Sequence, residues 1–385
     1  MCFNLKGEIF QANVEKLVNG GAGLLHYEGQ SIFMENTVPG DVVIGRIREK
    51  CKGFSLADLV EIVSESQNRV LPVCPLYGVC GGCSLQHISY EKQILEKKAI
   101  LKELIIHIGG INNPPAISVF PSEAFEYRNR VQFHRIGKDI GFKEKNSDKI
   151  IVINDCPIAD KGIRKALIEK RIKCPPEKDR FAVFSYKKTF LSEGEEKRGK
   201  VSLLNRDLTM NVGVFFQSNV ALLERVIEKI ISITKTVDND LPVADFYCGI
   251  GTFASFLQDS FKQIDLIEEN KDALLFAREN VRGERVTCSA ISVDEWVRVF
   301  LKKNKKTNYS FLIVDPPRQG LSPLFRKWLS ESGPPLLVYL SCDPATLARD
   351  TRELTRAYDL SEINFYDFYP QTAHIESLSL FSRHN

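Results

Sequence analysis

The segment VADFYCGIGTFASFL, residues 243–257, constrains the fold of this chain more than any other. It predicts a buried strand that ends in a glycine-rich turn and leads into a helix. Gly249 and Gly251 lack side chains, so the backbone of this turn can approach a ligand closely. A second apolar strand, QIDLIE, ends with Glu268, about twenty residues after the turn, where a carboxylate can accept hydrogen bonds from ribose hydroxyls.

The composition of this turn narrows the kind of cofactor it can hold. It carries two glycines rather than the three of the dinucleotide-binding pattern, and no phosphate-binding lysine follows it. These two features favour an adenosine cofactor without phosphates, such as S-adenosylmethionine, over NAD or ATP.

The chain from residue 211 onward alternates helical and strand patterns. Continuous apolar runs alternate with amphipathic stretches, which is typical of buried parallel strands connected by helices. The predicted strands are Val243–Tyr247, Phe311–Val314 and Leu336–Leu340, and the predicted helices include Leu222–Ile231 and Asp272–Asn280. The sequence therefore predicts an open, doubly wound, Rossmann-like α/β sheet.

The first 63 residues show a different pattern of short apolar runs separated by glycine turns. Ile32–Met34 and Val42–Ile44 read as strands, with Pro39–Asp41 as a turn between them. About five such strands in this length favour a small closed β-barrel, a shape often used to bind oligonucleotides. A small β domain without a ligand fits the same pattern.

The middle of the chain combines one predicted helix with a basic stretch. Ser89–Ile106 has helical periodicity and ends before glycine and proline pairs. Between Arg164 and Arg206 there are 13 Lys and Arg residues against 6 Asp and Glu, although the whole chain carries a net charge of only +3. We expect this stretch, with Arg128 and Arg130, to contact the phosphates of a polyanion; a solvated, loop-rich face for the stretch and ordinary surface or strand-pairing charges for the two arginines are the alternatives.

The overall composition excludes several classes of protein. A hydrophobic fraction of 43% with 26% charged residues is typical of a globular chain rather than a disordered one. No apolar run approaches the roughly 18 residues of a membrane span, and Lys6 and Glu8 interrupt the apolar core that a signal peptide needs. We expect a soluble, cytoplasmic protein.

The ten cysteines favour metal or catalytic use over a disulfide scaffold, because the expected compartment is reducing. Three of them form the pattern Cys74-x5-Cys80-x2-Cys83, and Cys156 lies in a later Asp-Cys-Pro segment. Prolines follow Cys74 and Cys156, as is common at iron–sulfur ligands. Zinc is the rival, although four-cysteine zinc sites use two C-x2-C pairs and this set contains one.

Three segments of the C-terminal half place reactive side chains next to predicted strands. FLIVDPPRQG delivers Asp315 to the edge of the sheet in a rigid Pro-Pro loop. LLVYLSCDP places Cys342 between a strand end and a helix start, a setting in which a thiol can act as a nucleophile; Cys248 is a competing candidate. PQTAHIESLSL places His374 and Glu376 before the last strand.

These motifs together resemble the RNA (uracil-C5)-methyltransferases that use S-adenosylmethionine. The matching segments, in chain order, are FFQSN, DFYCGIGTF, DPPRQG, YLSCDPATLARD and PQTAHIES. The first segment of the chain resembles a TRAM domain, an RNA-binding β-barrel. CPLYGVCGGCSLQHISYEKQ with the later DCPIAD resembles the iron–sulfur region of the 23S ribosomal RNA members.

The resemblance implies a role for each matching residue. Cys342 is expected to attack C6 of uracil, and Glu376 to remove the C5 proton. The cofactor and uracil pocket is expected to comprise Gln217, Tyr247, Glu268 and Asp315. A [4Fe–4S] cluster, rather than zinc, is expected on Cys74, Cys80, Cys83 and Cys156, with a structural role.

The expected organisation is a TRAM-like barrel over residues 1–63, a cluster and RNA-binding region over 64–205, and a methyltransferase domain over 206–385. The expected partner is RNA, 23S ribosomal RNA first and transfer RNA as the alternative, without an obligate protein partner. A non-catalytic RNA-binding factor would need neither Cys342 nor Glu376. A methyltransferase acting on adenine or glutamine nitrogen would carry Tyr or Phe after Asp-Pro-Pro, where this chain has Arg318.

Overall fold

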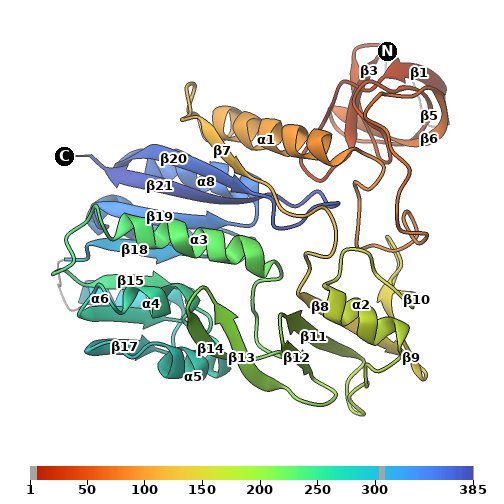
Figure 1. Cartoon of the computed structure of the whole chain (residues 1–385). Coiled ribbons are helices and arrows are strands. Elements are labelled where there is room, and N and C mark those ends of the chain that lie inside the picture. Colours follow the sequence, from red (N-terminus) through yellow and green to blue (C-terminus); the bar gives the residue numbers. More distant parts are fainter. Residues whose placement is uncertain (1–6, 303–307, 385) are drawn as a thin grey trace. The chain divides into compact units, whose positions relative to one another are not determined.

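The computed structural model describes residues 7–302 and 308–384, which form two compact units (Figure 1). The first unit comprises the described residues up to Leu101 together with Lys143–Ile151 and Tyr369–His374; the second comprises Lys102–Phe142, Val152–Phe368 and the described residues from Ile375. Within the described ranges, no helix is long and apolar enough to cross a membrane. The predicted three-part division stays a prediction.

The first unit contains a six-stranded sheet in the order β1-β5-β6-β4-β3-β2. Its neighbouring strands are antiparallel except β4 and β6, which run parallel. The strands are β1 (Ile9–Asn13), β2 (Lys16–Leu17), β3 (Gly23–Tyr27), β4 (Gln30–Met34), β5 (Val42–Lys50) and β6 (Phe54–Ser64). The predicted strands 32–34 and 42–44 lie within β4 and β5.

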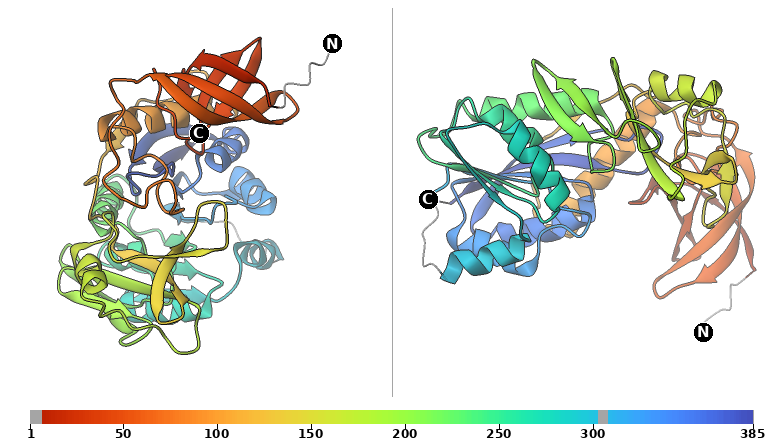
Figure 2. Two further views of the ribbon diagram at one scale, coloured as in Figure 1. Left: turned by 90° about the vertical axis from the view of Figure 1, so that its right-hand side faces the viewer. Right: turned by 90° about the horizontal axis from the view of Figure 1, so that it is seen from below.

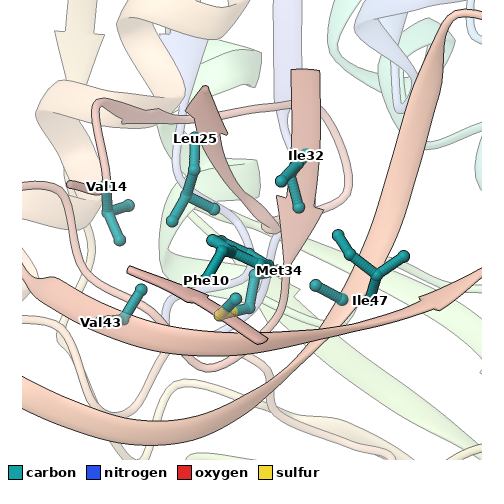
Figure 3. Close-up of a cluster of buried hydrophobic side chains, with 8 residues drawn as sticks. Phe10, Val14, Leu25, Ile32, Met34, Val43 and Ile47 are labelled. Atoms are coloured by element: carbon teal, nitrogen blue, oxygen red, sulfur yellow. The ribbon is translucent and has the colours of Figure 1, made fainter. Parts of the chain in front are cut away.

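One apolar core holds this sheet together (Figure 3). Side chains alternate along each strand, so Ile32 and Met34 of β4 point to the same interior as Val43 and Ile47 of β5. Between the last two lies Gly45, where a Cβ would sit 2.3 Å from Met34 Cε. Only glycine therefore fits at this position without moving the core.

Helix α1 (Tyr90–His107) confirms the helix predicted over 89–106, displaced by one residue at each end. It is followed by a five-stranded sheet in the order β10-β9-β8-β11-β12, which carries α2 (Lys161–Ile168), and by a hairpin. The strands are β8 (Arg130–Ile136), β9 (Asp139–Lys143), β10 (Ile150–Val152), β11 (Arg180–Tyr186) and β12 (Thr189–Ser192), with β13 (Arg198–Leu203) and β14 (Arg206–Asn211) in the hairpin.

The second unit is built around an eight-stranded sheet in the order β17-β16-β15-β18-β19-β21-β20-β7. The first five strands in this order, from β17 through β16, β15 and β18 to β19, are parallel. Strand β21 is antiparallel to both β19 and β20, and β7 is parallel to β20. The strands are β7 (Ile117–Phe120), β15 (Val243–Phe246), β16 (Gln263–Ile267), β17 (Arg285–Ser289), β18 (Phe311–Val314), β19 (Leu336–Ser341), β20 (Tyr358–Tyr366) and β21 (Glu376–Arg383). The predicted doubly wound α/β sheet is confirmed.

Helices cover both faces of this sheet (Figure 2). On one face α4 (Thr252–Leu257) contacts α3 (Val220–Ile233) and α5 (Lys271–Asn280). On the other face α7 (Pro323–Ser332) contacts α6 (Val293–Lys302) and α8 (Pro344–Leu354). Every residue of β15 and β18 is accordingly buried. Strand order reverses between β15 and β18, and ligands of such sheets bind outside the carboxyl ends of the strands at that point.

The first testable consequence concerns Gly45. The Gly45→Ala substitution should lower the free energy of unfolding by about 1–3 kcal/mol, because an added methyl overpacks a filled core. Urea unfolding measured by circular dichroism tests this expectation. Gly283→Ala is the control, since a Cβ there makes only ordinary contacts of 3.4 Å or more; an equal loss in both variants would contradict the packing argument.

Candidate active site

The glycine turn after β15 adopts the left-handed backbone conformation that glycine favours. The φ angles are 62° at Tyr247, 55° at Gly249 and 77° at Gly251. At Gly251 a Cβ would lie 2.9 Å from Val281 Cγ2, so the turn packs tightly against the end of α5. At Gly249 a Cβ would meet nothing within 4 Å, which leaves the backbone accessible to a ligand.

Glu268 follows β16 and is tied directly to this turn. Its Oε2 accepts a hydrogen bond from the Gly249 N–H at 3.0 Å, and its Oε1 accepts one from the Asn270 N–H at 2.8 Å. Asn270 in turn caps the first residues of α5. The carboxylate that the sequence places at the end of the second strand is therefore held beside the glycine turn.

Asp245 is a residue that the sequence analysis did not single out. It lies in β15 and is fully buried, and its Oδ2 accepts a hydrogen bond from the Ala254 N–H at 3.3 Å. Among the described residues, its Oδ1 has no hydrogen-bond partner. Burial raises the pKa of Asp245 well above its usual value, and the Asp315 and Glu268 charges add to the rise. An acidic residue inside the apolar run VADF was the available sequence signal.

Cys342 and Glu376 are brought together by the pairing of β19 with β21. In this antiparallel ladder Ser341 pairs with Ser377. Cys342, which follows Ser341, and Glu376, which precedes Ser377, are therefore neighbours. Both side chains are partly exposed. Burial, together with the Glu376 and Asp315 carboxylates, raises the pKa of the Cys342 thiol to about 12.

Asp315 follows β18 and interacts with the same group of residues. The Gln217 side chain, just before α3, donates to Asp315 Oδ2 at 3.4 Å. Burial raises the pKa of Asp315 to about 7, and this hydrogen bond opposes the rise. Burial and the Asp315 charge also raise the pKa of Glu376 well above its usual range, while Arg318 opposes that shift.

The parallel register of β15, β16 and β18 therefore gathers the glycine turn, Glu268 and Asp315 at the carboxyl ends of adjacent strands. The antiparallel strand β21 adds Glu376 beside Cys342. A carboxylate with a raised pKa is suited to proton transfer near neutral pH. The arrangement can thus combine a thiol nucleophile, a carboxylate base and a place for a ligand at the glycine turn.

The two competing side chains lie in different surroundings. Cys248 is 5% exposed within the turn, and its thiol donates weakly to the Gly249 carbonyl at 3.9 Å. Burial raises the pKa of Cys248 well above its usual value. His374 is exposed, belongs to the first unit and packs its ring edge-on against Tyr369.

The four predicted cluster cysteines are divided between the two units. Cys74, Cys80 and Cys83 lie in the first unit and Cys156 in the second. All four side chains are partly exposed thiols, and thiol chemistry suits metal ligation. Within the part of the chain that is described, however, no group of three or more His, Cys, Asp or Glu side chains forms a site that could hold a metal ion.

Several arginines expected to contact phosphates are engaged within the protein. Arg130 Nη2 donates to the Val212 carbonyl at 3.1 Å, and Arg128 Nε donates to the Arg130 carbonyl at 3.3 Å. In the basic stretch, Arg164 pairs with Asp155 at 2.7 Å and with Glu126 at 2.6 Å. These contacts give the three side chains structural roles, and their contact with phosphates stays a prediction.

Comparison with known proteins yields a family profile described as tRNA (uracil-5-)-methyltransferase, which matches residues 180–384. An uncharacterised RNA methyltransferase of Treponema denticola is 32% identical over 92% of this chain and 94% of its own. The 23S rRNA (uracil(1939)-C(5))-methyltransferase of Legionella pneumophila is 28% identical over 97% of both chains. The tRNA (uracil(54)-C(5))-methyltransferase of Schizosaccharomyces pombe is 28% identical over 93% of this chain and 75% of its own.

Among solved structures, the chain is similar to the Pyrococcus abyssi tRNA (uracil-54, C5)-methyltransferase in complex with S-adenosyl-L-homocysteine. The TM-score is 0.72 and the identity 24%, over 97% of this chain and all of the other. The likeness supports the fold described above.

The electrostatics of the site predict how Cys342 reacts in the free protein. At pH 9 Asp315 is ionised, because its pKa is about 7. The Asp315→Asn substitution removes this negative charge, lowers the pKa of the thiol and should speed alkylation of Cys342 by iodoacetamide roughly 2- to 10-fold, since one pKa unit changes the thiolate fraction about tenfold. Mass spectrometry of the Cys342 peptide measures the rate. Cys51, in the first unit, is the internal control; equal Cys342 rates in both proteins would contradict the expectation.

Proposed function

The chain belongs to the tRNA (uracil-5-)-methyltransferase family, and from this membership we propose that it methylates a uridine of 23S ribosomal RNA through a covalent bond between Cys342 and C6. It is an S-adenosylmethionine-dependent enzyme that methylates uracil C5 in RNA. The target RNA, the roles of the site residues and the metal cluster are the parts that we propose.

The observation that carries the catalytic proposal is the placement of Cys342 beside Glu376 by the β19–β21 register. Uracil C5 is a poor nucleophile, but Cys342 can change that once its thiol proton has passed to water. Addition of the resulting thiolate to C6 gives C5 the character of an enolate carbon. S-adenosylmethionine, when bound, supplies an electrophilic methyl group to that carbon. Glu376 then removes the C5 proton, the C5–C6 double bond re-forms and the bond from C6 to Cys342 breaks.

The remaining residues are proposed to bind and orient the reactants. The accessible backbone at Gly249 and the Glu268 carboxylate fixed beside it fit the adenosine part of S-adenosylmethionine. Tyr247 flanks the same turn. Asp315, which accepts a hydrogen bond from Gln217 and raises the pKa of Cys342, is proposed to contact the uracil or the methyl donor together with Gln217. The target base has to leave its stack to reach these groups.

The cysteine-rich segment supports 23S ribosomal RNA over transfer RNA as the target, because CPLYGVCGGC with the later DCPIAD resembles the 23S ribosomal RNA members. Coverage fits both targets: the match to the Legionella pneumophila 23S enzyme covers 97% of both chains, and the likeness to the Pyrococcus abyssi tRNA enzyme covers 97% of this chain and all of the other. The sheet of β1 to β6 would serve as the TRAM-like RNA-binding module, residues 64–205 as the central region and residues 206–385 as the methyltransferase domain. We place the enzyme in the cytoplasm, with its RNA.

We also propose that Cys74, Cys80, Cys83 and Cys156 hold a [4Fe–4S] cluster. Support comes from their spacing in the sequence and from the partial exposure of all four thiols. The proposed cluster has a structural role, since methyl transfer moves no electrons between protein and RNA.

The catalytic proposal predicts that Glu376→Gln traps the enzyme on its RNA. Thiol addition and C5 methylation do not need Glu376 as a base, but release does, and an amide cannot accept the C5 proton. A labelled protein–RNA species that survives denaturing electrophoresis should form with a 23S ribosomal RNA transcript and radiolabelled S-adenosylmethionine, and not with transfer RNA transcripts.

The Cys342→Ala, Glu376→Gln double variant is the control and should give no such species. Near-normal turnover by Glu376→Gln would remove Glu376 as the base. Trapping on transfer RNA rather than 23S ribosomal RNA would keep the chemistry and overturn the proposed target.

The cluster proposal predicts about four irons per chain in brown, anaerobically purified protein. Cys83→Ser should lose the iron and the visible absorption, because one ligand is removed. Cys174→Ser is the matched control and should keep both, since Cys174 is a partly exposed cysteine outside the proposed set. Stoichiometric zinc in a colourless, active preparation would contradict the proposal.

A further inference from the structure

The loop Tyr369–His374 connects β20 to β21 and ends two residues before Glu376. The two strands belong to the second unit, but these six residues belong to the first. The chain therefore leaves the second unit after Phe368 and returns to it at Ile375, which is 2% exposed. The first unit thus holds the backbone that leads directly into the proposed base.

The segment that follows Cys83 holds the centre of this loop. The N–H groups of Ser84 and Leu85 both donate to the Gln371 carbonyl at 3.0 Å. The Ser84 hydroxyl also accepts a hydrogen bond from the Ala373 N–H at 3.0 Å. Two consecutive residues of the cysteine-rich segment therefore fix two positions of the loop.

Helix α1 supplies a second set of bonds through Gln93, which is fully buried. Its Oε1 accepts from the Gln371 N–H at 2.9 Å, and its Nε2 donates to Gln371 Oε1 at 2.9 Å. The two residues are 278 positions apart in the sequence. Gln371 has a φ of 66°, a conformation that costs a residue with a side chain about 1 kcal/mol or more. The reciprocal amide pair stabilises that conformation.

The two ends of the loop are fixed as well. Lys97, one turn further along α1 and 1% exposed, donates from Nζ to the Tyr369 carbonyl at 3.0 Å. Gly21, in the turn between β2 and β3, lies so close that a Cβ there would be 2.9 Å from Ala373 Cβ. Three separate segments of the first unit thus contact the loop.

We propose that Ser84, Gln93 and Lys97 act as positioning residues that set the place of Glu376 for removal of the C5 proton. This inference rests on the proposed role of Glu376 as the base. Cys342 lies after β19, on a different connection of the sheet, so the loop does not lead into the nucleophile. Loosening the loop slows proton removal and release of the adduct more than it slows addition or methyl transfer.

The size of the effect follows from the geometry of proton transfer. A base has to lie within hydrogen-bond reach of the proton it removes, and a displacement of about 1 Å can cost about 100-fold in rate. A general loss of stability, by contrast, lowers the amount of active enzyme and reduces every step equally. The rate of methyl transfer and the rate of C5 proton release, measured on one sample, therefore separate a positioning effect from a loss of folded protein.

The test uses the full-length Gln93→Ala protein and a transcript of the RNA identified by the trapping experiment, prepared with uridine tritiated at C5. Methyl incorporation into total RNA and protein-bound RNA should stay within about 2-fold of wild type in a single turnover. Release of tritium to water should fall about 10- to 100-fold, and a covalent protein–RNA band should accumulate.

Two further variants keep the test decisive where Gln93→Ala folds poorly. Ser84→Ala removes only the hydroxyl that holds Ala373, and Gln371→Gly removes the side-chain amide while retaining a residue that favours positive φ. Both variants should lower the ratio of tritium release to methyl incorporation, as in Gln93→Ala. Ser66→Ala is the matched control, because Ser66 is a buried serine of the first unit whose hydroxyl donates to the Pro39 carbonyl; its ratio should equal that of wild type.

Equal reductions of both rates in Gln93→Ala and Ser84→Ala, without a covalent band, would overturn the inference. Glu376→Gln is assayed in parallel. If Glu376→Gln is trapped on RNA but Gln93→Ala and Ser84→Ala keep the wild-type ratio of tritium release to methyl incorporation, the positioning role alone is overturned. Normal turnover by Glu376→Gln would instead overturn the proposed base.

Discussion

The antiparallel pairing of β21 with β19 is the constraint on which the candidate active site depends. Strands β15, β16, β17, β18 and β19 are parallel. Their shared direction places the glycine turn, Glu268 and Asp315 at one edge of the sheet. An antiparallel strand begins at the edge where the parallel strands end, and β21 begins there with Glu376. The ladder that ends at Ser341 and Ser377 fixes the proposed nucleophile and base as neighbours.

This arrangement concentrates negative charge where water is scarce. Asp245, Asp315 and Glu376 each have a pKa raised by burial, because a carboxylate is poorly solvated there. The charge of Asp315 raises the pKa of the other two further. Burial, together with the Glu376 and Asp315 charges, raises the pKa of the Cys342 thiol and keeps it protonated in the free protein. Arg318 is the cation that opposes these shifts at Cys342 and Glu376, which gives the Asp-Pro-Pro-Arg loop an electrostatic function.

Much of the second unit could be predicted from sequence, because its strands are short apolar runs separated by amphipathic stretches. Phe311–Val314 was predicted with its observed ends, and the glycine turn was placed correctly. The proximity of Cys342 and Glu376 was available only through the resemblance, since spacing does not reveal the register of two strands. The Gln93–Gln371 pair could not be predicted, because nothing local marks a contact across 278 residues, and Asp245 went unnoticed within an apolar strand.

The central claim, a covalent bond from Cys342 to C6 of uracil, is tested most directly with RNA that contains 5-fluorouridine. Fluorine cannot leave C5 as a cation, so the methylated adduct cannot eliminate and persists. Mass spectrometry after nuclease and protease digestion should find methylated 5-fluorouridine monophosphate attached to the peptide that contains Cys342. An adduct on Cys248 or another residue, or methylation without any adduct, would contradict the account.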